Sequence, residues 1–487
     1  MTKQYEHDKE QQKKLMARQL RTLEELGGKL FDDDDVVYQG TQLILPENMD
    51  LKGAIAFLER KRQELEKETA FTKTFQYRPW DGAYCMWNAL KRTFGMVGHQ
   101  ETIIKTMFGT MKEPPEMMTI NVDVGRTEQV PWGTFALPPM PGLTFLTGTA
   151  KSEYGLLFTL TANGPKKYKN AVEGVFKLIE EELKTNSMYR GRAFDGQRMP
   201  EFVDLSAVDP RKVVYSQEVL TQLEANVWAQ LRHTEKFEEL GIPLKRAVLV
   251  HGPYGTGKTL AATLTGQEAT ANGWTFIKAR PGRDDLGDVL QTARLYQPCV
   301  VFYEDIDTIA APEAGEHAPI SRLLDDFDGV SAKGTKILMI LTTNHPERIH
   351  QGVVRPGRLD AMIEINDLDV SGVAKLIEAT IEGSLAPNVD WDQVFEAAQG
   401  YKPAFVTELA TRSVRYLVAR TGGDPGAQLV GTQDLVHAAE GLRDQYDTMM
   451  GARDTPERNE LSDVLAREVE AAATKAIREN VNDDILV

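Results

Sequence analysis

The sequence is very poor in cysteine: Cys85 and Cys299 are the only two among 487 residues. They lie far apart, and neither belongs to a CxxC motif or a cluster of cysteine and histidine, which excludes a disulfide scaffold and a zinc framework. The eight histidines show no ligand spacing, so we expect no structural metal. So little cysteine is typical of a reducing compartment, and we expect a cytoplasmic location.

The sequence also lacks a long hydrophobic run and an excess of positive charge. Its apolar stretches, such as Ile337 to Leu341, fall far short of the roughly 20 residues of a membrane-spanning helix. The first thirty residues are charged throughout and contain no apolar segment of a secretory signal. We therefore expect no membrane partner. The net charge of -16 argues against nonspecific nucleic-acid binding, although a local basic channel would be compatible with it.

Hydrophobic spacing in residues 1–205 predicts an α+β region. An amphipathic helix is expected over residues 1–26, and a second helix near residues 51–70. From Met117 to Gly164, apolar and polar residues alternate with a period of two, which predicts the strands of one small sheet.

The rest of this region contains a helix signal and an aromatic cluster. Gly164-Pro165 is expected to open a helix, because proline is tolerated in a first turn. The polar segment from Thr185 to Pro200 is expected to connect to the next domain. Four aromatic residues lie close together earlier in the chain: Tyr77, Trp80, Tyr84 and Trp87. We interpret them as core packing, with a binding platform as the alternative.

A glycine-rich loop follows the apolar run that begins at Arg246, and the sequence there reads RAVLVHGPYGTGKT. Backbone N–H groups of such a loop surround an anion, its lysine reaches the outer phosphates, its hydroxyl binds Mg²⁺, and a helix N-terminus follows. The motif therefore predicts a phosphate-binding loop between a strand and a helix. Its predicted binding residues are Gly252, Pro253, Tyr254, Gly255, Thr256, Gly257, Lys258 and Thr259.

Two later apolar runs end in polar side chains. The run Cys299 to Tyr303 is followed by Glu304 and Asp305, which could hold hydrated Mg²⁺ and polarise an attacking water. The run Ile337 to Leu341 leads to Asn344, whose amide could orient that water. Strands often end in such residues for turn chemistry alone. The order and spacing after the phosphate-binding loop favour the catalytic interpretation.

Arg355 and Arg358 flank a rigid Pro-Gly turn beyond Asn344. Two arginines placed so could clamp the charge that develops on a transferring γ-phosphoryl group. A surface turn with salt bridges is an equal alternative on spacing alone.

Residues from about 209 to 445 resemble the AAA clade of the AAA+ ATPase superfamily. The resemblance rests on the phosphate-binding loop, on the approach segment Glu235 to Pro243 and on the run from Asn344 to Arg358. A further stretch, Gly400 to Phe405, resembles the lid segment near the adenine. The implied fold class is α/β: a P-loop NTPase core of the AAA+ type, with a parallel sheet flanked by helices and a small α-helical lid, preceded by the α+β N-terminal domain.

The resemblance also implies cofactors and roles. ATP and Mg²⁺ are the expected cofactors, and Pro403 and Ala404 are expected to lie near the adenine. Lys258 would neutralise the β and γ phosphates. The implied Mg²⁺ ligands are Thr259 and Glu304, the residues implied to orient water are Asp305 and Asn344, and those implied to reach a neighbouring subunit's nucleotide are Arg355 and Arg358. The last pair implies a homo-oligomeric ring of six subunits, with seven as the alternative.

Two features depart from most of the clade. Most members end the acidic strand in Asp-Glu, whereas this chain has Glu304-Asp305, which places a shorter carboxylate beside the water; a misplacement of about 1 Å can cost on the order of a hundredfold in rate. The pore loop, aromatic in substrate-threading members, is replaced by the segment from Arg280 to Leu286, which has no aromatic residue. Both features resemble the mitochondrial translocase of the folded Rieske protein. We expect no counterpart of that family's membrane helix.

The same segment carries Arg280 and Arg283. A ring of these arginines would form a positive pore mouth suited to nucleic-acid phosphates. The alternative is two solvated loop charges that Asp284 and Asp285 answer.

Together the patterns predict four parts: an N-terminal client or partner domain (1–205), a large ATPase domain (206–369), a helical lid (370–445) and a helical tail (446–487). An apolar face over Gln433 to Met450 predicts the last lid helix. The predicted function is to couple ATP hydrolysis to the remodelling or translocation of a protein client. The alternatives are a nucleic-acid-associated motor, which the net charge disfavours, and an ATP-switched scaffold with very slow hydrolysis.

Overall fold

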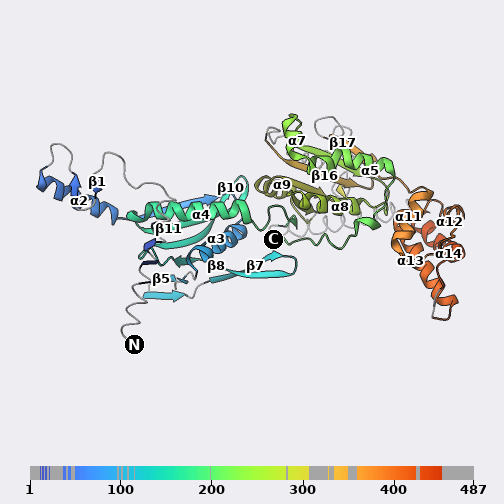
Figure 1. Ribbon diagram of the computed structural model, residues 1–487, viewed down its shortest axis with the longest axis horizontal. Coiled ribbons are helices and arrows are strands. Elements are labelled where there is room, and N and C mark those ends of the chain that lie inside the picture. Colours follow the sequence, from blue (N-terminus) through green and yellow to red (C-terminus); the bar gives the residue numbers. More distant parts are fainter. Residues whose placement is uncertain are drawn as a thin grey trace, which may run out of the picture. The chain divides into compact units, whose positions relative to one another are not determined.

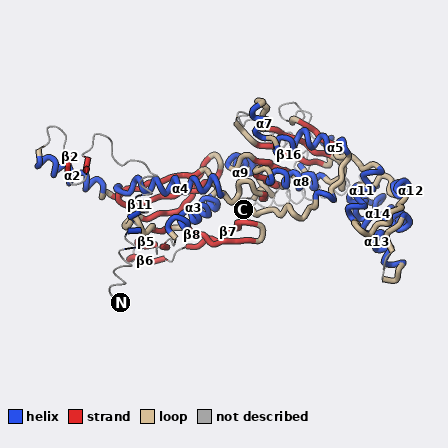
Figure 2. Tube along the Cα trace, in the orientation of Figure 1, coloured by secondary structure: helices blue, strands red, loops and turns tan. Residues whose placement is uncertain are grey.

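We describe the protein from a computed structural model (Figures 1 and 2). The described residues are 50–95, 98–99, 102–106, 109–113, 116–197, 199–280, 283–306, 327, 334–348, 359–423 and 428–451, with short pieces between 11 and 44. Most of the helix predicted at residues 1–26, both Arg355 and Arg358, and the tail beyond 451 lie outside these residues.

The chain divides into two structural units. The first comprises Met1–Ala207, Leu223–Val250 and Ala262–Ile363. The second comprises Val208–Gln222, His251–Ala261 and Glu364–Val487. Among the described residues, no helix is long and apolar enough to cross a membrane.

The N-terminal part of the first unit is α+β, as predicted. Its helices are α2 (Leu51–Leu65), α3 (Pro79–Phe94) and α4 (Lys169–Asn186). Its strands are β1 (Val37–Gln39), β2 (Gln42–Ile44), β3 (Glu68–Phe75), β4 (Gly98–His99), β5 (Thr102–Thr106), β6 (Gly109–Glu113), β7 (Glu116–Asp123), β8 (Arg126–Trp132), β9 (Thr134–Ala136), β10 (Thr144–Ser152) and β11 (Gly155–Pro165). The main sheet has the order β3-β11-β10-β9-β4, with antiparallel pairs throughout. Helices α3 and α4 pack on each other and against this sheet (Figure 1).

Three sequence predictions for this part were wrong in detail. The alternating segment does not form one sheet, because β7 and β8 pair only with each other as a separate hairpin. Gly164-Pro165 does not open a helix: both residues end β11, since they pair with Thr69 and Glu68 of β3. Helix α4 instead begins at Lys169, after a 3-10 turn.

The third correction concerns the expected connection at residues 185–200. It contains β12 (Ala193–Asp195), which pairs in parallel with β14 (Thr275–Ala279) as an edge strand of the second sheet. A strand this short, between arginine and glycine residues, has no alternation long enough to predict it.

The second sheet of the first unit has six strands in the order β12-β14-β15-β16-β13-β17. The remaining strands are β13 (Arg246–His251), β14 (Thr275–Ala279), β15 (Cys299–Tyr303), β16 (Ile337–Thr343) and β17 (Ala361–Glu364), and the flanking helices include α6 (Ala229–Arg232), α7 (Thr234–Glu239), α8 (Lys258–Ala271) and α9 (Leu286–Leu295). Pairing is parallel from β12 through β16. All residues of β15 and β16 are buried, as expected of parallel strands covered on both faces. The predicted α/β core is confirmed.

The second unit contains a bundle of four helices. They are α11 (Val370–Thr380), α12 (Trp391–Ala397), α13 (Pro403–Arg420) and α14 (Thr432–Gly451). Its apolar core includes the whole face predicted for the last helix, Leu435, Ala438, Ala439, Leu442 and Tyr446. Helices are therefore present where the lid is predicted, and Figure 2 shows them as a compact group.

Candidate active site

The glycine-rich loop directly follows β13 and precedes α8, in the predicted strand-loop-helix context. Gly252 and Gly255 have positive φ angles of 151° and 80°. A Cβ on Gly252 would lie 2.6 Å from the carbonyl oxygen of Ile365, so this position has no room for a side chain. Thr256 is buried, and its hydroxyl donates to the carbonyl of Pro253 over 2.9 Å. The loop is held curled by its own backbone and side chains, as a phosphate cradle requires.

Lys258 is the first residue of α8 and is only 7% exposed. Its ammonium group donates to the carbonyls of Gly252 and Pro253 over 2.7 and 2.8 Å. The side chain therefore lies folded along the inside of the loop. Thr259 and Tyr254, by contrast, are exposed.

Tyr215, which the sequence analysis did not identify, contacts the same loop. Its hydroxyl donates to the carbonyl of Gly257 over 2.7 Å, and burial raises its pKa above the usual 10, so the proton stays on the oxygen. Val213, Val214 and Tyr215 also line a cavity of about 510 Å³ together with α11. No motif marks this tyrosine, and only its contact with the loop reveals it.

The start of α13 lies against the loop. The N–H of Ala404 donates to the carbonyl of Gly255 over 3.1 Å, and a Cβ on Gly255 would lie 3.3 Å from the side chain of Ala404. Pro403 occupies the first position of α13 and is buried. The structure thus brings the predicted lid residues to the phosphate-binding loop.

Lys402, at the N-cap of α13, holds this stretch in place. Its ammonium group bonds both carboxylate oxygens of Asp367 over 2.7 Å each, and the lysine side chain is 11% exposed. Because Asp367 precedes α11, this ion pair joins the two ends of the stretch that carries the first lid helices. The sequence analysis missed this pair, since neither residue belongs to a motif.

The acidic residues after β15 form a second group, in the first unit. Asp305 has a φ of 50°, and it is the one non-glycine residue with positive φ among those that the structure describes. This conformation costs free energy and is concentrated at functional sites. The N–H of Asp305 donates to the hydroxyl of Thr342 over 3.0 Å, and the amide of Asn344 donates to its carboxylate over 3.1 Å. The two residues predicted to orient water are therefore in direct contact.

Glu304 has a partner that the sequence analysis did not predict. Lys278, near the end of β14, lies 3.5 Å from its carboxylate, and the two side chains are 19% and 18% exposed. The N–H of Glu304 also donates to the carbonyl of Ala279 over 3.2 Å, which continues the pairing of β14 and β15. In the sequence, the only signal for this ion pair is that Lys278 lies near the end of an apolar run.

Each predicted Mg²⁺ ligand carries an oxygen donor of a kind that Mg²⁺ takes, with waters and phosphate oxygens as its further ligands. Thr259 offers a hydroxyl and Glu304 a partly exposed carboxylate. Within the described part of the chain, no cluster of three or more metal-binding side chains occurs.

In the segment after β14, Arg283 is paired with an acid that the sequence analysis did not name. The guanidinium of Arg283 donates to Asp195 over 2.9 Å, so its partner is on β12. The two neighbouring acids act on backbone instead: Asp284 accepts from the N–H of Arg280 and Asp285 caps α9. The expectation that these two acids answer the arginines is therefore wrong for Arg283.

The aromatic cluster is resolved in favour of packing. Tyr77, Trp80, Tyr84 and Trp87 are partly buried and pack against the main hydrophobic core of the first unit. Three of them lie on α3, a helix that the sequence analysis did not predict.

A parallel sheet with a phosphate-binding loop after one strand and carboxylates after a nearby one defines a P-loop nucleotide-hydrolase core. In the sheet order, β16 lies between β15 and β13. Residues 248–367 match the family model of the ATPase family associated with various cellular activities (AAA). The chain therefore carries an AAA ATPase domain of the AAA+ superfamily.

Two curated proteins are similar over this part. The chain is 30% identical over 236 residues to ATP-dependent zinc metalloprotease FtsH 1 of Conexibacter woesei, which covers 45% of this chain and 36% of that protein. It is also 30% identical over 203 residues to Protein SAV of Sulfolobus acidocaldarius, covering 39% of this chain and 26% of the relative. The match thus spans about a third or less of the length of either relative.

Proposed function

We propose that this chain is a Mg²⁺-dependent ATPase that forms a ring and uses ATP hydrolysis to remodel or translocate a protein client. The observation that carries the proposal is the hydrogen bond from Asn344 to Asp305, which follows β15. The phosphate-binding loop of the same chain has the curled backbone that binding a phosphate requires. A carboxylate held by an amide is suited to accept a hydrogen bond from water. The AAA match of residues 248–367 and the similarity to an ATP-dependent metalloprotease support ATP hydrolysis.

In this proposal the water oxygen attacks the γ-phosphorus of ATP, and the bond to the bridging β-γ oxygen breaks. The products are ADP and inorganic phosphate. Asp305 and Asn344 orient the water, and Asp305 accepts a hydrogen bond from its leaving proton, which the phosphate product finally carries. Lys258 neutralises charge on the β and γ phosphates. Thr259 and Glu304 would hold Mg²⁺, which supplies charge neutralisation on the phosphate oxygens when it is bound.

The remaining parts of the proposal concern assembly. Arg355 and Arg358 of one subunit would reach the nucleotide of the next, which requires a ring of six or seven copies. Residues 206–369 would form the large ATPase domain, 370–445 the lid, and 1–205 the region that chooses the client. The Glu-Asp order and the absence of an aromatic pore residue support a folded client, as in the Rieske-protein translocase type.

One capture experiment tests the client class. Asp305→Asn protein, which we expect to bind ATP without hydrolysing it, is charged with ATP in a lysate of its own host and recovered by affinity. The matched control is Lys258→Ala, which we expect not to bind nucleotide productively. A specific protein retained only by Asp305→Asn would support the proposal.

Two other results would contradict it. Nuclease-sensitive nucleic acid on the Asp305→Asn ring would favour a nucleic-acid motor, for which the paired Arg283 offers little support. A ring that retains neither protein nor nucleic acid would favour an ATP-switched scaffold.

A further inference from the structure

A buried polar joint connects the N-terminal α+β region to helix α9 within the first unit. Arg78, at the N-cap of α3, extends its guanidinium to α9, where it donates to the carbonyl of Asp288 over 3.4 Å and to the hydroxyl of Thr292. The same guanidinium donates to the carbonyl of Tyr154 over 3.1 Å, in the turn between β10 and β11. Burial lowers the pKa of Arg78. One side chain thus fastens three elements.

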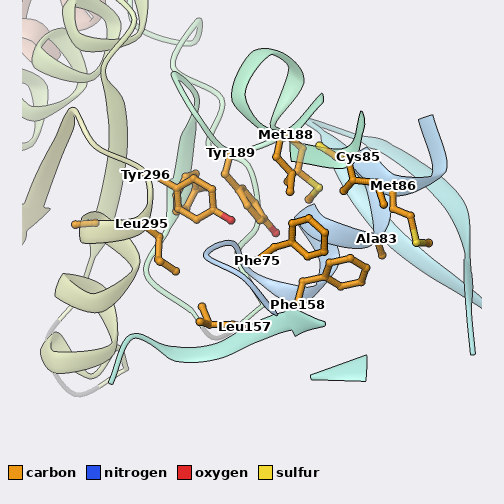
Figure 3. Close-up of a cluster of buried hydrophobic side chains, with 14 of the residues drawn as sticks. Phe75, Ala83, Cys85, Met86, Leu157, Phe158, Met188, Tyr189, Leu295 and Tyr296 are labelled. Atoms are coloured by element: carbon orange, nitrogen blue, oxygen red, sulfur yellow. The ribbon is translucent and has the colours of Figure 1, made fainter. Parts of the chain in front are cut away.

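Tyr296, directly after α9, forms the other half of the joint. It is fully buried, and its hydroxyl accepts the N–H of Arg78 over 3.0 Å. Burial raises the pKa of Tyr296 well above 10, so the hydroxyl keeps its proton. Figure 3 shows the ring of Tyr296 beside Tyr189 in this cluster, with the two rings 5.5 Å apart.

Asp81 anchors the joint inside the N-terminal region. Its carboxylate is fully buried and accepts the hydroxyl of Ser187 over 2.6 Å and the N–H of Met188 over 2.9 Å. Burial raises the pKa of this carboxyl group. A buried carboxylate is costly unless it is hydrogen-bonded in this way, and removing one donor leaves it under-satisfied. Asp81 therefore depends on the positions of Ser187 and Met188.

Helix α9 packs against β15, and the residues that flank the helix are linked to the two ends of that strand. At its start, the carbonyl of Asp284 accepts the hydroxyl of Tyr303, the last residue of β15, over 3.4 Å. Tyr303 precedes Glu304, and burial raises its pKa to about 12, so it remains a donor. At its end, Tyr296 lies three residues before Cys299, where β15 begins. A shift of α9 would therefore be felt at the catalytic end of β15.

A cavity of about 450 Å³ borders the joint, lined on one side by Gln291 and Thr292 of α9 and on the other by Trp80 and Leu156 of the N-terminal region. The hydrophobic core continues from the N-terminal region to Leu295 and Tyr296, and the cavity lies beside it, next to the hydrogen bonds of Arg78. Space beside such bonds permits small relative shifts that a close-packed core would resist.

We propose that Arg78 and Tyr296 are positioning residues that couple the N-terminal region to Glu304 and Asp305 through α9. The proposal rests on the proposed ATPase function. It adds a route by which a client bound at the N-terminal region and the nucleotide bound at the ATPase site influence each other. Coupling of two sites is reciprocal, so ATP must alter the N-terminal side of the joint as much as the N-terminal region alters ATP binding. The N–H of Met188, bonded to Asp81, is a direct reporter of that side.

The test measures amide hydrogen exchange at Met188 and along α3 in full-length Asp305→Asn protein, with and without ATP and Mg²⁺. We expect ATP to change exchange at these amides several-fold. Adding Tyr296→Phe, which removes only the hydroxyl, is expected to abolish most of that ATP-dependent change while ATP affinity stays within about twofold. Tyr189→Phe, which removes a hydroxyl from the same cluster but not from the joint, is the matched control and should keep the full change.

Arg78→Met provides a second variant with the same expectation, and melting temperatures establish that each variant is folded. If ATP still changed hydrogen exchange fully in folded Tyr296→Phe and Arg78→Met, the proposed coupling would be wrong. It would also be wrong if ATP bound to the parent Asp305→Asn protein without changing hydrogen exchange at these amides. Failure of the parent to bind ATP at all would overturn the proposed function and the joint with it.

Discussion

The two main sheets of the first unit differ in how they are buried and in how much their sequences reveal. In the six-stranded sheet, every residue of β15 and β16 is buried. In the five-stranded sheet, β3 alternates between exposed and partly buried positions along most of its length. Polar residues directly after a fully buried run are conspicuous, and Glu304, Asp305 and Asn344 are of this kind. In the N-terminal region, polar residues alternate with apolar ones along the strands, so no polar residue stands out as a candidate for function.

The residues proposed to bind phosphate lie close together in the sequence, whereas the residues proposed to couple the N-terminal region to the ATPase site do not. The phosphate-binding loop lies within one short segment, and its contact with Ala404 was foreseeable from a family pattern. The joint of Arg78 with Tyr296 spans 218 residues of sequence. Only the fold brings these two residues together.

The largest expected effect is at the phosphate-binding loop. Lys258→Ala should lower kcat/KM for ATP on the order of a hundredfold to a thousandfold, because a buried ammonium group that stabilises developing charge is lost. Phosphate release under steady-state conditions measures this. Lys236→Ala, which removes an exposed lysine paired with Glu239, is the control and should retain activity. Equal activity of both variants would refute the assignment of the loop.

A substitution that disturbs packing on the N-terminal sheet should lower the free energy of unfolding rather than the rate of ATP hydrolysis. A Cβ on Gly82 of α3 would lie 2.2 Å from the ring of Phe158 in β11, so Gly82→Ala should lower the free energy of unfolding by about 1–3 kcal/mol. Urea unfolding measures the change. Gly431→Ala, where a Cβ meets nothing within 4 Å, should be near neutral. No loss of stability in Gly82→Ala would show that α3 does not pack on β11 as described.

The kinetics of Asn344→Ala show whether this amide positions Asp305 and the water or only ends a strand. Asn344→Ala should lower kcat roughly tenfold or more with little change in KM, since the amide acts on Asp305 and the water rather than on nucleotide affinity. Asn272→Ala, an exposed asparagine after α8, is the control. A rise in KM with unchanged kcat would instead place Asn344 in nucleotide binding.

The smallest effect is a pH dependence of the second unit. Burial lowers the pKa of His251, and Lys258 lowers it further against the opposing charge of Glu364. The unfolded state therefore binds the proton more readily, so stability from this group is present above its unfolded pKa of about 6.5 and falls as the pH drops below that value. The melting temperature of wild type should decrease from pH 7.5 to 5.5 more than that of His251→Gln. Parallel decreases would contradict this.

Much of the catalytic core could be predicted from the sequence because hydrophobic runs and short motifs carry it. Strand β15 was predicted with its observed bounds, Cys299–Tyr303. The partners of that strand could not be predicted in the same way. Lys278 meets Glu304 across neighbouring strands, and Tyr215 meets the loop across a chain reversal, so neither contact leaves a local pattern.

The N-terminal errors have a physical cause as well. Helix α3 begins with Pro79 and carries large aromatic residues, which resemble a cluster more than an amphipathic helix, and tertiary packing decides its structure. Strands β7 and β8 alternate as a sheet strand should, but alternation does not tell which strands pair. The predicted domain limits and the ring remain predictions.

Single-turnover hydrolysis of bound ATP by wild type, Asp305→Asn and Asp305→Glu tests the central claim most directly. Asparagine tolerates the positive φ at this position, so Asp305→Asn removes the charge with little strain. The account predicts a rate about a hundredfold lower for Asp305→Asn, with ATP affinity within twofold of wild type. If the shorter carboxylate limits reach, Asp305→Glu should be faster than wild type. An unchanged rate in Asp305→Asn would contradict the claim that this carboxylate acts on the attacking water.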